Sequence, residues 1–265
     1  MKRLDVCLED VQEVYAGPAG VLWELLMGEE IHVGGWEDTE TLAALAGVTG
    51  DTRVLDVCSA LGGPARHLAG RFGCRVMGLD ATPKMIEEAE RRTAAAGLSD
   101  RVRFRLGDAL AMPFADAAFD IVWGQDAWCY VTDKAQLIRE AHRVLRPGGT
   151  IAFTDWVQTG AMDDATWEHL HRFMVFPYTE TLDGYTVLME DAGFAVVRFE
   201  DISSTFPAHC REYRRQLTTT LRDQVCGRFG EELYRAAEQG IAGWIDAAER
   251  GLVGRGRWIG WKADG

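Results

Sequence analysis

Five aspartates occur in succession where buried strands are expected to end, namely Asp56, Asp80, Asp108, Asp126 and Asp155. Parallel strands bring their carboxyl ends to one edge of a sheet, so these carboxylates are expected to gather there. A carboxylate at such an edge accepts hydrogen bonds from sugar hydroxyls, or it caps the helix or turn that follows. Five in the same position are hard to explain by capping alone, and they indicate a ligand site.

The segment 54–63, VLDVCSALGG, predicts a buried strand, a tight turn and the start of a helix. Small side chains let a backbone approach a ligand, and free N–H groups at a helix start attract an anionic group. Cys58 and Ala60 stand where such a loop usually carries glycine, which disfavours a pyrophosphate and therefore NAD or FAD. The structural alternative is a tight turn packed under a helix.

Two of the aspartates have the spacing of a nucleotide site. Asp80 comes 24 residues after Asp56, where a carboxylate binds ribose hydroxyls in nucleotide-binding α/β folds. Asp108, in GDALAMPF, is placed to address an adenine edge together with the next backbone N–H.

Short apolar strands alternate with amphipathic helices from residue 53 onward, which predicts parallel βαβ units. We expect an α/β fold with a Rossmann-like, mostly parallel seven-stranded sheet, helices on both faces and a helical cap. The strands are expected at 53–57, 75–80, 101–108, 119–126, 150–157, 195–203 and 255–263. The units are expected to be an N-terminal helical lid (1–50), a ligand-binding core (51–157), and the remaining strands with an inserted cap (158–265). One or two long helices are expected over 207–250.

Composition narrows the class of protein. The chain has 265 residues and a net charge of −13, so we expect no nucleic-acid or membrane partner. Its six cysteines have neither zinc-site nor redox-motif spacing, which indicates reduced thiols and a cytoplasmic location. Nothing in the sequence indicates a metal, a signal peptide or a membrane helix.

The set VLDVCSALGG, GLD (78–80), GDALAMPF and LRPGG (145–149) resembles the class I S-adenosylmethionine-dependent methyltransferases over roughly residues 53–157. The resemblance implies S-adenosyl-L-methionine as cofactor and S-adenosyl-L-homocysteine as product. It implies that the 54–63 loop holds the methionine part, Asp80 the ribose, and Asp108 with Ala109 the adenine. The full set of expected cofactor residues is Asp56, Ala60, Gly62, Asp80, Ala81, Met85, Asp108, Ala109 and Gln125.

Two further segments, GEEIHVGGW (28–36) and WGQDAWCY (123–130), are similar to the glycine/sarcosine/dimethylglycine N-methyltransferases and to phosphoethanolamine methyltransferases. This narrower resemblance implies methyl transfer by in-line displacement to a small-molecule amine or amino-acid nitrogen of the sarcosine/dimethylglycine type. Tyr130 stands where those relatives carry a histidine. The alternative is a carbon, oxygen or sulfur acceptor on a larger hydrophobic metabolite.

An amine that arrives as ammonium must lose a proton before it reacts, and the expected acceptors are Asp126, His32 and Tyr15. Aromatic residues are frequent in the expected cap, and aromatic rings attract ammonium and sulfonium cations. Packing in the cap core is the alternative for each ring. The expected substrate contacts are Trp128, Tyr130, Trp156, Tyr178 and Arg172. We expect a small-molecule acceptor as partner, and a monomer or homodimer.

Overall fold

The computed structural model describes residues 2–263. Its centre is a seven-stranded sheet in the order β3-β2-β1-β4-β5-β7-β6, in which only β7 runs antiparallel to its neighbours. The strands are β1 (Arg53–Val57), β2 (Arg75–Asp80), β3 (Val102–Leu106), β4 (Phe119–Gln125), β5 (Leu145–Gln158), β6 (Phe194–Asp201) and β7 (Val253–Lys262). The predicted α/β fold with a mostly parallel seven-stranded sheet is confirmed.

Helices cover both faces of the sheet, because the central strands are apolar on both sides. On one face, α3 (Gly35–Ala46) and α4 (Gly63–Phe72) pack on the sheet through a shared apolar core. On the other face, α6 (Lys134–Val144) and α8 (Leu182–Asp191) do the same. A further helix, α5 (Pro83–Ala95), packs on β2 and β3.

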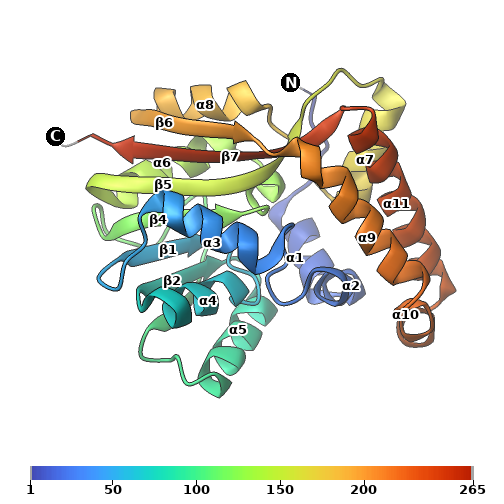
Figure 1. Ribbon diagram of the computed structural model, residues 1–265, viewed down its shortest axis with the longest axis horizontal. Helices are drawn as coiled ribbons and strands as arrows, with labels where there is room; N and C mark the ends of the chain where they lie inside the picture. Colours follow the sequence, from blue (N-terminus) through green and yellow to red (C-terminus); the bar gives the residue numbers. More distant parts are fainter. Residues whose placement is uncertain (1, 264–265) are drawn as a thin grey trace.

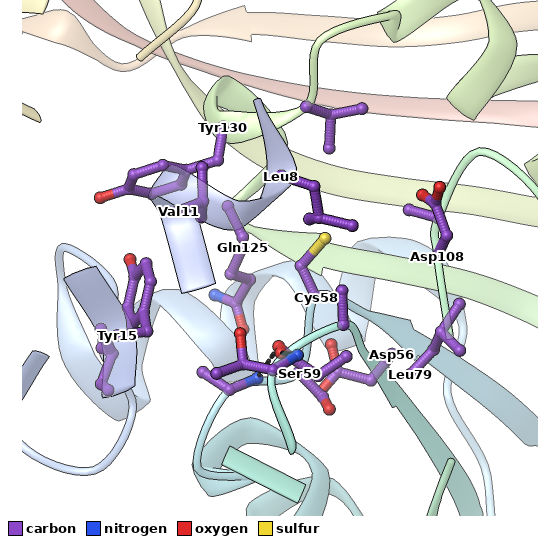
Figure 2. A pocket seen from close by; sticks show the side chains of 18 of the residues that line it. Leu8, Val11, Tyr15, Asp56, Cys58, Ser59, Leu79, Asp108, Gln125 and Tyr130 are labelled. Atoms are coloured by element: carbon purple, nitrogen blue, oxygen red, sulfur yellow. Dashed lines mark hydrogen bonds between the residues drawn. The ribbon is translucent and has the colours of Figure 1, made fainter. Parts of the chain in front are cut away.

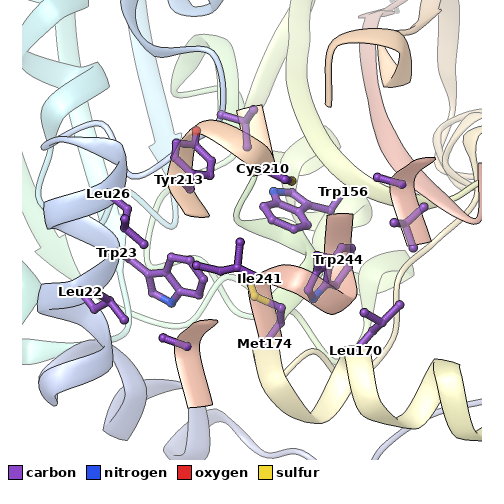
Figure 3. Packing of buried hydrophobic residues seen from close by; sticks show 14 of the residues in the cluster. Leu22, Trp23, Leu26, Trp156, Leu170, Met174, Cys210, Tyr213, Ile241 and Trp244 are labelled. Carbon is purple, nitrogen blue, oxygen red and sulfur yellow. The ribbon is translucent and has the colours of Figure 1, made fainter. Parts of the chain in front are cut away.

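The remaining helices gather at one end of the sheet (Figure 1). Four of them pack around Trp156 of β5 (Figure 3). The Trp156 ring lies 4.8 Å from the rings of both Phe206 and Trp244. We call this group, together with the short α10, the cap. It consists of α2 (Pro18–Met27), α7 (Asp164–Met174), α9 (Phe206–Thr218), α10 (Arg222–Phe229) and α11 (Glu231–Glu249).

The structure differs from the sequence prediction in three places. The region 207–250 forms three helices, because the chain leaves the helix near Thr219 and again at Gly230, which has a φ of +90°. The segment 1–50 divides between two places, since α2 joins the cap whereas α3 covers the sheet. Strand β5 begins at Leu145 rather than at 150, because Leu145 already pairs with Phe119.

Three short helices complete the fold. α1 (Leu8–Ala16) packs against α2 and α5. The 3₁₀ turns η1 (Trp128–Tyr130) and η2 (Ser203–Thr205) follow β4 and β6. Within residues 2–263, no helix combines the length and the apolar character that a membrane span needs.

The start of α4 touches the segment that follows α2. A Cβ atom on Gly63 would lie 2.4 Å from the carbonyl oxygen of Glu29, whereas one on Gly70 in the same helix would meet nothing within 4 Å. We predict that Gly63→Ala lowers the free energy of unfolding by about 1–3 kcal/mol, because backbone must shift. The control Gly70→Ala should raise it by up to about 1 kcal/mol. Urea denaturation measures both, and equal effects would contradict the close contact.

Candidate active site

A cavity of about 1030 Å³, including its part open to solvent, lies at the carboxyl ends of β1, β2 and β4. We call it the outer cavity. Asp56, Asp80 and Gln125 come from these strand ends, and α1 closes the cavity with Leu8 and other side chains. Figure 2 shows Tyr15 and Tyr130 at one end of the cavity and Asp108 at the other. The expected ligand site at the sheet edge is therefore a formed cavity.

The five aspartates divide into two groups. Asp56, Asp80, Asp108 and Asp126 line the outer cavity together. Asp155 is fully buried, and it accepts hydrogen bonds from the Tyr185 hydroxyl and the Cys129 amide. Burial raises the pKa of Asp155 to about 6. This carboxylate holds η1 in place and does not line the cavity.

The loop after β1 adopts the backbone of a glycine-rich loop, although two of its left-handed positions are not glycine. Cys58 and Ala60 have φ values of +64° and +43°, in the left-handed region that L residues rarely adopt, and Gly62 follows at +69°. The Ala60 amide donates to Asp80 Oδ2 over 2.9 Å, and the Thr82 amide donates to Asp80 Oδ1 over 2.8 Å. Asp80 thus fixes the loop against β2 while it lines the cavity.

Three buried polar atoms that line the outer cavity have no hydrogen-bond partner in the described protein. They are Asp56 Oδ2, Ser59 Oγ and Gln125 Nε2. Burial, and then the neighbouring Asp80 carboxylate, raise the pKa of Asp56 to about 7. Buried polar atoms are normally satisfied, so this set fits a ligand that carries both a cationic and an anionic group.

The other expected cofactor residues have mixed positions. Ala60, Ala81 and Ala109 line the outer cavity. Gly62 precedes α4 as its N-cap, and Met85 is buried in α5, so neither is part of the cavity wall.

A second, smaller cavity of about 260 Å³, including its part open to solvent, adjoins the first, and we call it the inner cavity. The two share Tyr15, Ile31, Asp126 and Tyr130 in their walls. The inner cavity reaches into the cap, and most of its wall is aromatic or aliphatic. Its remaining lining residues are Trp23, Met27, His32, Trp156, Met174 and Phe176.

Asp126 was expected to accept a proton, but both of its oxygens are engaged. Oδ1 accepts from the Thr154 hydroxyl and from Arg255 Nε, at 3.0 and 3.1 Å. Oδ2 accepts from the Val33 amide at 2.8 Å and lies 2.9 Å from Arg255 Nη2. A carboxylate has about four lone-pair sites, and all are taken. The geometry therefore contradicts a general-base role and makes Asp126 an anchor.

His32 is also engaged on both sides. The carbonyl oxygen of Val33 can only accept, so His32 Nδ1 donates to it over 3.1 Å, and Nε2 lies 3.0 Å from the Thr39 hydroxyl. Burial lowers the pKa of His32, which keeps the ring neutral. Tyr15 and Tyr130 meet edge to face at 5.3 Å, and burial raises the pKa of both hydroxyls. None of these side chains has a free basic site near neutral pH.

The expected substrate contacts separate into two groups. Tyr130 and Trp156 line the inner cavity. Trp128 lines neither cavity; it is fully buried in the core, stacked 4.3 Å from Phe153, with its Nε1 donating to the Val57 carbonyl.

The two other expected contacts lie away from both cavities. Tyr178 is buried beneath Lys134, whose Nζ lies 3.6 Å from the ring centre. Arg172 is on the outer surface, where it pairs with Glu168.

Sequence reasoning missed Arg255, which is buried on β7 and joins Asp126 to Asp38. Its neighbour Arg257 pairs with Asp38 and Glu200. Two arginines at alternate positions of an otherwise apolar strand share one face, and buried arginines need carboxylate partners. That pattern was the available signal.

We predict that Arg255→Gln lowers the free energy of unfolding by about 3–5 kcal/mol, because it leaves two buried carboxylates without their shared cation. Arg172→Gln is the matched control, since its pair with Glu168 is exposed, and it should change stability by less than about 0.5 kcal/mol. Urea denaturation followed by circular dichroism gives both values. A similar small effect of the two substitutions would show that Arg255 is dispensable.

Comparison with known proteins gives consistent results. A family model described as "Methyltransferase domain" matches residues 55–153. Methyltransferase GfsG of Streptomyces halstedii is 32% identical over 71% of this chain and 74% of its own length. Sarcosine/dimethylglycine N-methyltransferase of Halorhodospira halochloris is 27% identical over 92% and 90%. A crystal structure of a putative sarcosine dimethylglycine methyltransferase from Galdieria sulphuraria superposes with a TM-score of 0.84 at 24% identity, covering 93% of this chain and 98% of that one.

Proposed function

The chain belongs to the methyltransferase family, and we propose that it transfers a methyl group from S-adenosylmethionine to the nitrogen of a small amine. The observation that carries the proposal is the pair of adjoining cavities. The outer one presents buried polar atoms without partners and suits the cofactor, and the inner one is small and aromatic and suits the acceptor. Tyr15 and Tyr130 stand at the junction between them.

The residues of the outer cavity fit S-adenosylmethionine. When bound, the cofactor supplies an electrophilic methyl group on a sulfonium. Asp56 would hold the ammonium group of its methionine part, because Oδ2 is a buried acceptor without a partner. Ser59 Oγ and Gln125 Nε2 can donate to the carboxylate. Asp80, beside the loop after β1, would hold the ribose, and Asp108, at the far end, would hold the adenine.

The inner cavity can prepare an amine without a protein base. Attack needs the neutral amine with a free lone pair, and an apolar wall removes the water that would otherwise hydrogen-bond to that lone pair. In-line attack needs that lone pair directed at the methyl group, and close walls restrict the amine to few orientations. The rings of Tyr15, Tyr130 and Trp156 then stabilise the cationic product by about 0.5–2 kcal/mol each.

A second candidate is methyl transfer to a carbon, oxygen or sulfur atom of a larger hydrophobic metabolite. The apolar wall of the inner cavity favours it, since an uncharged hydrophobic group would also fit there. The inner cavity is smaller than the outer one, which favours the small amine.

Mass spectrometry of a panel of acceptors tests the choice. We expect small secondary and tertiary amines to gain a methyl group, at a rate that rises with pH and follows the ionisation of the amine. Two amines whose pKa values differ by about one unit should give profiles displaced by about one pH unit. Methyl gain on phenols or carbon acids alone would support the second candidate. Coincident pH profiles would mean that a protein group controls the rate.

The pKa of Asp56 makes cofactor binding depend on pH. Because its folded-state pKa is about 7, the carboxyl is mostly protonated below pH 7, and a cationic ligand favours the ionised form. We predict that affinity for S-adenosylhomocysteine increases about tenfold from about pH 6 to about pH 8. Isothermal titration calorimetry measures this.

Two variants serve as controls for this pH dependence. Asp56→Asn should remove most of it, whereas Asp108→Asn should keep it, because Asp108 is exposed at the other end of the cavity. An unchanged slope in Asp56→Asn would reject the assignment of Asp56.

A further inference from the structure

The two cavities have an uneven charge. Their described lining residues include five carboxylate side chains, but no lysine or arginine. Among these described lining residues, His32 is the one basic side chain, and it is neutral and engaged on both nitrogens. The acidic residues are Glu30, Asp56, Asp80, Asp108 and Asp126 in the outer cavity, and of these Asp126 alone also lines the inner cavity.

Three basic side chains in this part of the fold already have partners outside the two cavities. Arg255 is shared between Asp126 and Asp38. Lys134 Nζ donates to the carbonyl oxygens of Val131 and Tyr178, both at 3.0 Å, and lines neither cavity. Arg172 faces solvent, with 68% of its side chain exposed. None of the three can bind an anion in the inner cavity without breaking its present contacts or moving a helix.

The ion-pair network behind the inner cavity does not supply positive charge either. It joins three carboxylates, Asp38, Asp126 and Glu200, to three guanidinium groups, Arg198, Arg255 and Arg257. Its formal balance is therefore zero. A carboxylate or phosphate placed in the inner cavity would lose its hydration and gain no counter-ion, which is unfavourable.

We propose that the acceptor site selects an amine without an anionic group, and that it excludes amino acids and phosphorylated amines. That the acceptor is an amine rests on the proposed function. That acceptors with an anionic group are excluded rests on the charges of the residues around the cavities. The sarcosine/dimethylglycine and phosphoethanolamine enzymes that the sequence resembles are named for acceptors that carry a carboxylate or a phosphate. This chain therefore departs from them in substrate class, toward alkylamines and amino alcohols.

The wall of the inner cavity gives such an acceptor what it needs. The rings of Tyr15, Tyr130, Trp156 and Phe176 form a partial aromatic cage, in which Tyr130 lies edge to face with Tyr15 at 5.3 Å and with Phe176 at 4.7 Å. An aromatic cage binds a methylated ammonium group through the ring faces and needs no counter-ion.

Choline and glycine betaine are a matched pair of probes, because they share a trimethylammonium group and differ in a hydroxymethyl against a carboxylate. On protein saturated with S-adenosylhomocysteine, calorimetry should give choline at least tenfold tighter binding than glycine betaine. Equal or tighter binding of glycine betaine would overturn the proposal, and so would the absence of choline binding. Neither probe has a nitrogen lone pair, so this result does not depend on turnover.

Substitutions of Tyr130 distinguish ligand binding by its aromatic ring from a general loss of folding. Tyr130→Phe should keep choline affinity within about twofold, whereas Tyr130→Leu should lower it about three- to thirtyfold, the range expected for one lost ring. Equal losses in the two variants would assign binding to the hydroxyl instead and contradict the cage. Thermal unfolding of both variants controls for misfolding.

Turnover distinguishes failure of this inference from failure of the proposed function. Dimethylaminoethanol should be methylated at least tenfold faster than dimethylglycine. If dimethylglycine reacts as fast, the exclusion of anions is wrong and amine methylation stands. If choline binds and no amine is methylated, the inferred preference of the acceptor site for ligands without an anionic group stands, and the proposed reaction is wrong.

Discussion

The buried ion pair between Arg255 and Asp126 is the interaction on which the site depends. It joins the last strand of the sheet to the tip of β4, across 129 residues of sequence. Asp126 has a φ of +53°, a strained conformation for a non-glycine residue that persists only when its surroundings hold it. The residues that follow Asp126 lead directly into η1 and Tyr130. The same carboxylate accepts from the Val33 amide, so it also fixes the segment that carries His32.

The two cavities divide the chemistry between the two parts of the fold. The sheet supplies the outer cavity, with polar atoms at strand ends and a loop held by Asp80. The cap supplies most of the inner cavity, with apolar and aromatic side chains that exclude water. A methyl donor needs fixed polar contacts, whereas an amine acceptor needs desolvation and a cation-tolerant wall. The strand ends of the sheet provide the fixed polar contacts, and the packed helices of the cap provide the desolvated wall.

Some site features could be read from residue types and spacing because they depend on local backbone. The loop after β1, Asp80 at the end of β2, and Asp108 after β3 follow from the order of strands and turns. The roles of Asp126 and Trp128 could not be read in this way. Asp126 meets its partner only through the antiparallel pairing of β5 with β7. Trp128 turns inward because η1 bends the chain toward Phe153, and a strand pattern cannot indicate that bend.

The sequence by itself determined the class of fold, the cofactor edge of the sheet and the family resemblance, because alternating apolar segments, turn residues and strand-end aspartates act over short distances along the chain. The tertiary structure alone decided which acidic side chains are free and which are neutralised, since that depends on contacts between distant segments. It left Asp56 without a partner, gave Asp126 four donors and placed the arginines behind the inner cavity rather than in it. The electrostatic character of the acceptor site is therefore a property of the folded chain.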